Sequence, residues 1–200
     1  TFFAHPEQFE HLQRRLLPRL LDLARKGHRL RIWSPGCGKG AEPYSIAMTV
    51  LDVAPDARCL DIRILATDPD PHMLEVAQSA TYSTSDLHTV PELFKARWAE
   101  PLAGLPTRRY RLDPAVRDLV RFQVMPLEGP YPLSAYFDAI FCRDVLAQLS
   151  GSAQRKVWSA MMPLLAPGGV LYTGNEELIT GPALAELKSA GAAAYQRMAA

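Results

Sequence analysis

The sequence predicts an α/β protein with a Rossmann-like parallel sheet, and two short segments carry most of that prediction. The first is an apolar run at residues 30–33, followed by a turn with three glycines and then by a helix-compatible run at 44–51. The second is an apolar run at residues 61–67, which ends directly before Asp68. A strand, a helix and a second strand in this order form a βαβ unit, whose strands are parallel and whose crossover is right-handed.

Apolar spacing places the elements around this unit. Hydrophobic residues recur at helical spacing before the first strand, which predicts a helix over residues 6–25 with a kink near Pro18. The apolar positions of this helix are Phe9, Leu12, Leu16 and Leu20. After the second strand we expect a helix over Pro71–Ser79, with Asp70 as its N-terminal cap.

Residues 81–122 interrupt the alternation of strands and helices. They contain several prolines, a helical piece near 91–98 and two strand-like runs, at 109–112 and 119–122. The alternation then resumes, which predicts a strand at 137–142, a helix at 152–165 and a strand at 170–173. The tail, residues 183–198, is rich in alanine and is expected to be helical.

Composition limits the classes of function. The chain has 200 residues, 48% of them hydrophobic, which suits one domain with an ample core. Its net charge of +1 gives no bulk attraction to nucleic acid or to a membrane surface. The three cysteines lack metal-ligand spacing, so we expect no metal site and no disulfide framework. No secretory signal or membrane-length apolar run is present, and a cytoplasmic location is expected.

The glycine turn and the acidic strand end indicate a nucleoside-containing cofactor. Gly36, Gly38 and Gly40 would let the backbone approach a ligand closely, beside a helix start with unpaired N–H groups. Asp68, at the end of the next strand, would accept hydrogen bonds from both hydroxyls of a ribose. These residues alone leave open NAD, a nucleotide and S-adenosylmethionine.

Longer motifs resolve this choice through a resemblance. The matching segments are FF at 2–3, GCGKGAEPYSIAM at 36–48, ATD at 66–68, FDAIFCRDV at 137–145, PGGVL at 167–171 and GNEE at 174–177. In this order they resemble TxFFR, GCSTGEEPYSIAM, ATD, FDxIFCRNV, PGGxL and GHSE of the CheR-type methyltransferases, which esterify glutamates of bacterial chemoreceptors. The resemblance spans residues 2–177 and is specific, because six motifs agree in order.

The resemblance implies the class I S-adenosylmethionine-dependent methyltransferase fold. Residues 1–200 would form one catalytic domain, with 81–122 as a small inserted antiparallel subdomain and without the helical domain that precedes it in the family. S-adenosylmethionine would be the cofactor and S-adenosylhomocysteine the product. The partner would be a protein substrate, the cytoplasmic segment of a receptor.

The family's site residues carry over by position. The glycines would line the methionine part of the cofactor, Glu42 would pair with its ammonium group, Asp68 with its ribose, and Leu127 would flank adenine. Arg143 would face the cleft as a catalytic residue. The positions assigned to the cofactor are Gly36, Cys37, Gly38, Gly40, Glu42, Asp68, Leu127, Cys142 and Arg143.

Each of these residues also has a purely structural explanation. The glycines could form an ordinary turn, Glu42 could stabilise a helix start, Asp68 could cap a helix, and Arg143 could form a structural ion pair. We interpret Cys37 and Cys142 as small buried residues and not as nucleophiles. No histidine is needed, because a glutamate carboxylate with a pKa near 4.3 is already ionised and can be methylated without a general base.

The residues that differ from the family motifs cluster at the positions that the resemblance places beside the transferred methyl group and the acceptor. Ala4 stands where the family has arginine, Asp144 where it has asparagine, Gln148 where it has tyrosine, and Pro126 where it has an adenine-side asparagine. A cation and a hydroxyl are thereby lost beside the acceptor, and a negative charge is gained. Such lost positioning groups cost on the order of a hundredfold in rate.

Three interpretations follow. The chain is a divergent protein-glutamate O-methyltransferase, a non-catalytic module that binds S-adenosylmethionine or S-adenosylhomocysteine in signalling, or a methyltransferase for another acceptor that uses Asp144 or Gln148.

A local basic cluster has two interpretations as well, a surface for an acidic protein segment or a solvated strand edge. Its members are Arg108, Arg109, Arg111, Arg117 and Arg121.

Overall fold

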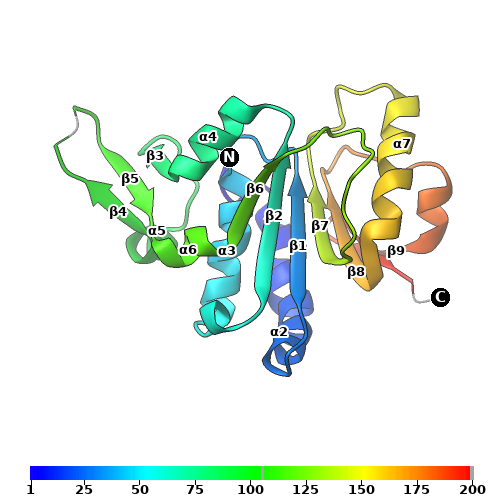
Figure 1. Ribbon diagram of the computed structural model, residues 1–200, viewed down its shortest axis with the longest axis horizontal. Coiled ribbons are helices and arrows are strands. Elements are labelled where there is room, and N and C mark those ends of the chain that lie inside the picture. The colour runs from blue at the N-terminus through cyan, green and yellow to red at the C-terminus, as the bar shows by residue number, and fades with distance from the viewer. Residues whose placement is uncertain (105, 199–200) are drawn as a thin grey trace.

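A seven-stranded sheet forms the centre of the molecule (Figure 1). The computed structural model describes residues 1–104 and 106–198. The strand order is β6-β2-β1-β7-β8-β10-β9, and every neighbouring pair from β6 to β8 is parallel. The strands are β1 Leu30–Pro35, β2 Ile62–Asp68, β6 Val120–Val124, β7 Phe137–Cys142, β8 Leu165–Thr173, β9 Leu187–Gly191 and β10 Ala194–Arg197. β10 is antiparallel to both of its neighbours, β8 and β9.

The register of the central strands brings the predicted ligand-binding segments to one edge. β1 and β2 pair from Leu30↔Ile62 to Pro35↔Thr67, so both strands end at the same level. The glycine turn follows β1 directly and Asp68 closes β2. This is the edge at which open α/β sheets bind their ligands.

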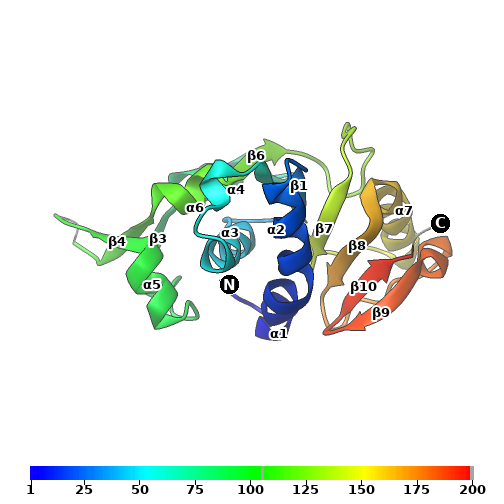
Figure 2. The same cartoon turned by 90° about the horizontal axis from the view of Figure 1, so that it is seen from below.

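Helices cover both faces of the sheet and divide the core in two (Figure 2). One face carries the N-terminal helix, α3 (Ala41–Val53) and α6 (Pro114–Asp118), and the other carries α7 (Gly151–Met161). α4, Pro71–Ser79, has the expected bounds, and the Asp70 carboxylate caps it by accepting from His72 N at 2.8 Å. None of the helices in residues 1–104 and 106–198 is long and apolar enough to cross a lipid bilayer.

The N-terminal helix contains a π-helical turn where a kink was expected. α1 (Pro6–His11) and α2 (Leu17–Arg25) are joined through π-helical residues Leu12–Leu16. Pro18 lies in the first turn of α2. Its missing N–H breaks the regular ladder, and the wider turn accommodates the break, with Leu17 N–H bonded to Leu12 O.

The tail was expected to be helical, and this prediction is wrong. After a 3-10 turn at Pro182–Glu186, the chain forms the antiparallel hairpin of β9 and β10. Three consecutive residues with positive φ, Gly191 to Ala193, make its turn. β10 pairs with β8, and Ala194 is buried there. Sheet pairing and burial thus override the helix propensity of the alanines.

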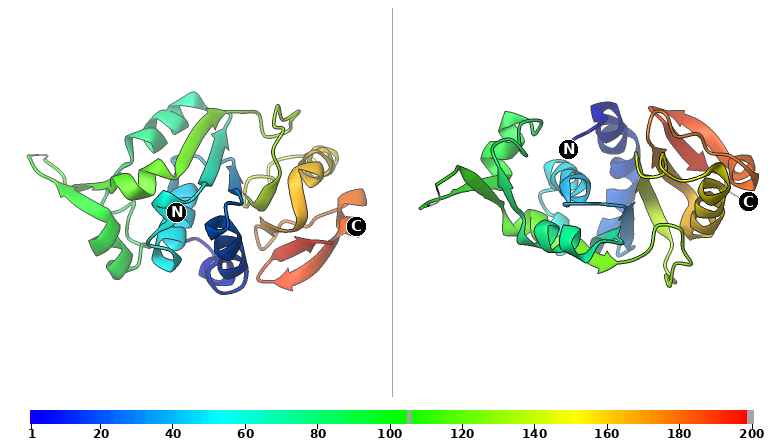
Figure 3. Two further views of the ribbon diagram at one scale, coloured as in Figure 1. Left: turned by 60° about the horizontal axis from the view of Figure 1, so that its bottom comes forward. Right: turned by 90° about the horizontal axis from the view of Figure 1, so that it is seen from above.

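A second, three-stranded antiparallel sheet lies beyond the β6 end of the large sheet (Figure 3). Its order is β3-β5-β4, with strands Thr81–Ser83, Arg109–Leu112 and Ala99–Leu102, and α5 (Glu92–Trp98) precedes β4. The expected insertion ran to residue 122, but β6 pairs with β2 in the large sheet. The small sheet itself therefore spans 81–112, and Arg121 on β6 is separated from Arg109 and Arg111 on β5.

A buried carboxylate joins β7 to β1 and gives a stability test. Asp138 Oδ2 accepts from Arg31 N at 2.9 Å, and burial raises the pKa of this carboxyl group. Asp138→Asn keeps an acceptor for that N–H and removes a buried charge, so we expect the unfolding free energy to stay near that of the unchanged chain. Asp138→Ala leaves the N–H unpaired and should cost about 1–3 kcal/mol. Urea denaturation at pH 7 measures both, and equal losses in the two variants would contradict this account.

Candidate functional site

The glycine turn is held against its neighbours by close backbone packing. Gly36 and Gly38 have positive φ, +66° and +51°. A Cβ added to Gly36 would lie 2.6 Å from Val145 Cγ1, whereas a Cβ on Gly38 would meet no atom within 4 Å. Cys37 N donates to Thr67 O at 3.0 Å, which ties the turn to the end of β2. Gly38 is therefore the point at which the turn presents bare backbone to a ligand.

Asp68 is fixed between the turn and the start of α4. Its Oδ2 accepts from Gly38 N at 2.8 Å and its Oδ1 accepts from Asp70 N at 3.0 Å. The residue is buried, and each oxygen of a carboxylate can accept a further hydrogen bond. The structure thus places the predicted ribose acceptor beside the predicted glycine turn, with its orientation set by two backbone donors.

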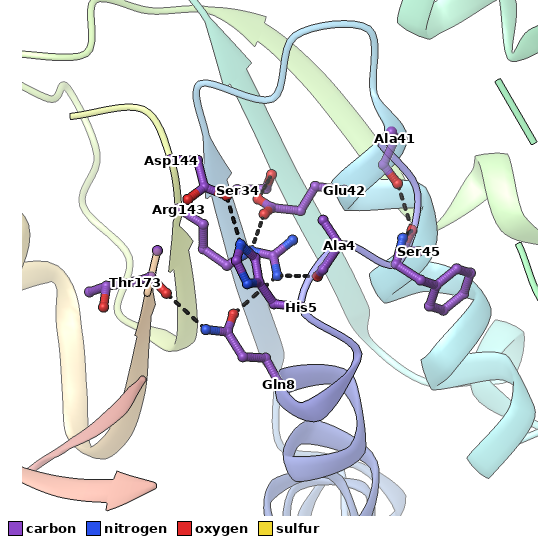
Figure 4. A network of polar contacts seen from close by, with 12 residues as sticks. Ala4, His5, Gln8, Ser34, Ala41, Glu42, Ser45, Arg143, Asp144 and Thr173 are labelled. Carbon is purple, nitrogen blue, oxygen red and sulfur yellow. Dashed lines mark hydrogen bonds and ion pairs between the residues drawn. The ribbon is translucent and has the colours of Figure 1, made fainter. Parts of the chain in front are cut away.

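Glu42 and Arg143 form an ion pair at the ends of β1 and β7 (Figure 4). Arg143 Nε lies 2.5 Å from Glu42 Oε2, and Ser34 Oγ donates to Glu42 Oε1 at 2.6 Å. Arg143 Nη1 donates to Ala4 O at 2.7 Å and to Gln8 Oε1 at 3.0 Å. Only 3% of the Arg143 side chain is exposed, so its guanidinium is committed to protein partners.

Gln8 and Ser34 complete this network and were not identified from the sequence. Gln8 is fully buried, and its Nε2 donates to Thr173 O at the end of β8 (2.8 Å). It lies one helical turn before Leu12, on the apolar face of its helix. A polar residue on the apolar face of a helix could have identified Gln8 as a network member, because buried polar groups need hydrogen-bond partners.

A pocket of about 520 Å³ adjoins the network at the ends of β7 and β8. His5 Nε2 donates to Asp144 Oδ2 at 2.9 Å, and Asn175 Nδ2 donates to His5 Nδ1 at 3.1 Å. His5 and Asp144 both have positive φ, 56° and 59°, a strained conformation for residues other than glycine. The lining consists of His5, Asp144, Ala147, Gln154, Asn175, Glu176 and Glu177.

Only some of the residues that differ from the family motifs lie at this pocket. Asp144 lines the pocket, and the Ala4 carbonyl is bound to Arg143 beside it. Gln148 is exposed, and Pro126 lies in the loop after β6. Glu177 is buried, and its carboxylate accepts from the backbone N–H groups of Asp144, Leu146 and Gly174.

Leu127 is half-buried against the core of the α7 face. The Tyr131 hydroxyl donates to Leu127 O, and the Tyr131 ring meets Trp33 edge-on at 4.9 Å between centroids. Tyr131 therefore sets the path of the backbone at Leu127.

The two cysteines at the site are buried thiols. Burial raises the pKa of both, and the carboxylates of Asp68 and Glu42 raise that of Cys37 further. Cys142 as a whole residue is 0% exposed, so neither its thiol nor its backbone is open to a ligand in this structure. Within the described ranges, no group of three or more His, Cys, Asp and Glu side chains could hold a metal ion.

The arrangement suits a ligand with a vicinal diol and a cationic group. Asp68 offers acceptors for hydroxyls, Glu42 is a nearby anion, and the backbone at Gly38 is open. Glu42 accepts one hydrogen bond at each oxygen, which leaves lone pairs for a ligand's ammonium.

The two glycines should respond differently to alanine. Both substitutions place a Cβ at positive φ, which costs about 1–2 kcal/mol of stability. Gly36→Ala adds the clash with Val145, worth about another 1–3 kcal/mol. We expect Gly36→Ala to lower the urea midpoint more than Gly38→Ala, and the reverse order would contradict the packing described.

Comparison with known proteins identifies the family of this chain. The family model described as "CheR methyltransferase, SAM binding domain" matches residues 1–193. A "Probable chemotaxis protein methyltransferase" of Rhizobium etli is 37% identical, over 98% of this chain and 73% of its own length. "Chemotaxis protein methyltransferase 1" of Pseudomonas aeruginosa is 32% identical, over 89% of this chain and 65% of its own length.

Solved structures were matched as well. PKMT2 from Rickettsia typhi in complex with AdoHcy is 17% identical, with a TM-score of 0.44, over 72% of this chain and 20% of that one. The glycopeptide N-methyltransferase MtfA complexed with S-adenosyl-L-methionine is 12% identical, with a TM-score of 0.44, over 79% of this chain and 53% of that one.

The family model spans nearly the whole chain, and the motifs predicted to hold a nucleoside cofactor lie together in the structure. The chain therefore belongs to the CheR methyltransferase family, as its S-adenosylmethionine-binding domain.

Proposed function

We propose that the chain transfers the methyl group of S-adenosylmethionine to glutamate carboxylates of a chemoreceptor or a related signalling protein in the cytoplasm. One observation carries the proposal: the intact set of cofactor-facing groups at the ends of β1 and β2 adjoins a pocket at the ends of β7 and β8. The names of the relatives support the link to chemotaxis.

Each predicted site residue receives a role in this proposal. The backbone from Gly36 to Gly40 follows the methionine part of the cofactor, Glu42 pairs with the ammonium, and Asp68 accepts from the ribose hydroxyls. Leu127, held by Tyr131, covers adenine. Arg143 acts as a positioning residue, because it orients Glu42 and binds the backbone at Ala4. Cys142 supports this edge of the sheet as a fully buried residue at the end of β7.

Methyl transfer to a carboxylate depends on the alignment of the two reactants and needs no proton transfer. The cofactor supplies a methyl group on a positively charged sulfur. An acceptor carboxylate oxygen forms a bond to that carbon as the bond from carbon to sulfur breaks, which yields a methyl ester and a neutral thioether. The acceptor is already ionised at neutral pH, so the chain's residues need to hold both partners in line and keep water out.

The pocket at the ends of β7 and β8 favours one alternative, a module that binds the cofactor without turnover. Asp144 and Glu176 line the pocket, and no lysine or arginine does. These carboxylates would repel an acidic acceptor, and His5 is already bonded to Asp144 and Asn175.

Asp68 tests the cofactor site. Asp68→Ala removes the ribose acceptor and should weaken binding of S-adenosylhomocysteine by about 1–3 kcal/mol, roughly 5- to 150-fold. Titration calorimetry measures this. The matched control is Asp70→Ala, which removes only the α4 cap and should leave affinity nearly unchanged. Equal affinities of Asp68→Ala and the unchanged chain would remove Asp68 from the site.

Methyl transfer itself is tested with radiolabelled S-adenosylmethionine and a receptor cytoplasmic fragment. Because methyl esters of glutamate hydrolyse in base, we expect label in the fragment that base releases as volatile methanol. Base-stable label would indicate another acceptor. Binding of S-adenosylhomocysteine without any transfer would favour the non-catalytic module.

A further inference from the structure

A second pocket lies between the N-terminal helix and strands β8, β9 and β10. Its volume is about 330 Å³, within the range of small-molecule sites. The side chains that line it are His11, Arg15, Leu16, Arg19, Val170, Ala190 and Gln196. It shares no residue with the cofactor site, and the function proposed above does not use it.

The arginines of this pocket differ from the other arginines on the same helix. Arg14 pairs with Glu10 at 2.8 Å and Arg25 pairs with Asp56 at 3.0 Å. Among the described residues, Arg15 and Arg19 lie within 4.0 Å of no carboxylate, and Arg19 has a long contact of 3.5 Å to Gly168 O. None of the described residues that line the pocket is acidic, and Asp138, the carboxylate that interacts with Arg19, lies outside the lining. The two guanidinium groups, one helical turn apart, therefore give the pocket a net positive field.

His11 adds a third donor. Tyr172 is buried with its ring stacked on Phe141, and burial raises the pKa of its phenol, which stays protonated. Its hydroxyl lies 2.9 Å from His11 Nδ1, and with the hydroxyl as the donor of this bond the neutral imidazole carries its proton on Nε2. Burial, and then the charge of Arg15, lower the pKa of His11 and favour this neutral form.

We propose that this pocket binds the phosphate group of a small phosphorylated molecule. Guanidinium groups match the geometry and charge of phosphate oxygens through paired N–H donors, and the imidazole N–H supplies a further donor. Leu16, Val170 and Ala190 form an apolar wall beside the cations, which would contact the organic part of a monoester. The net charge of the whole chain is only +1, so this attraction is local.

The test uses inorganic phosphate and phenyl phosphate as probes, titrated calorimetrically at constant ionic strength with chloride as the reference anion. Phenyl phosphate is a monoester without the adenosine that the cofactor site would bind. We expect saturable binding of both probes. The double variant Arg15→Ala/Arg19→Ala should weaken it at least about tenfold, since charge-assisted hydrogen bonds are lost. The matched control is Arg14→Ala/Arg25→Ala, which removes two arginines of the same helix that have carboxylate partners and should leave binding nearly unchanged.

The two probes separate the sources of the phosphate. Tighter binding of phenyl phosphate indicates a monoester whose organic part contacts the apolar wall, and equal binding indicates that the phosphate group suffices. Binding that responds equally to both double variants, or no binding at all, overturns the proposal. Affinity for S-adenosylhomocysteine, measured in the same samples, should be unaltered by either double variant, so loss of the cofactor site is recognised separately.

A measurement on the unchanged chain guards against variants that fold poorly. Phosphate should shift the amide NMR signals of Ala190 and Gln196, which line the pocket on β9 and β10, and leave those of Gly38 and Asp68 in place. Shifts confined to the glycine turn would overturn the proposal, because they would show phosphate binding at the cofactor site instead.

Discussion

The buried guanidinium of Arg143 is the constraint on which the site depends. A cation removed from water needs a counter-charge and hydrogen-bond acceptors, and Arg143 finds them in three separate parts of the chain. Glu42 comes from the start of α3, Ala4 from the N-terminal segment, and Gln8 from the first helix. Satisfying one side chain therefore assembles the elements that surround the cofactor-binding edge.

The same network orients the Glu42 carboxylate, which we propose pairs with the cofactor. Glu42 is bound on one oxygen by Ser34 and on the other by Arg143, so its remaining lone pairs point in fixed directions. Gln8 extends the network to Thr173 at the end of β8. The ends of β1, β7 and β8 are thus joined by side chains as well as by the sheet, which makes the site a rigid part of the fold.

Sequence reasoning succeeded where the determinants are local. The glycine turn, Asp68 and the Asp70 cap can be read from short segments, because positive φ, strand ends and helix starts impose their own residue types. It failed for the tail, where alanines favour a helix in isolation but pair with β8 in the folded chain. The partners of Arg143 could not be predicted for a similar reason, because Glu42 is 101 residues away along the chain. Motif position predicts that both residues belong to the site, but only the fold shows that they form an ion pair with each other.

The order of strands at the far end of the sheet has a consequence for biosynthesis. β10 follows β9 along the chain, yet it lies between β8 and β9 in the sheet. While the ribosome has delivered β9 but not β10, the outer edge of β8 has unpaired backbone groups, and β9 has no strand to join. Such an edge can pair with other chains. The nascent protein therefore remains exposed to misassembly until β10 emerges and is inserted between two strands that precede it in the chain.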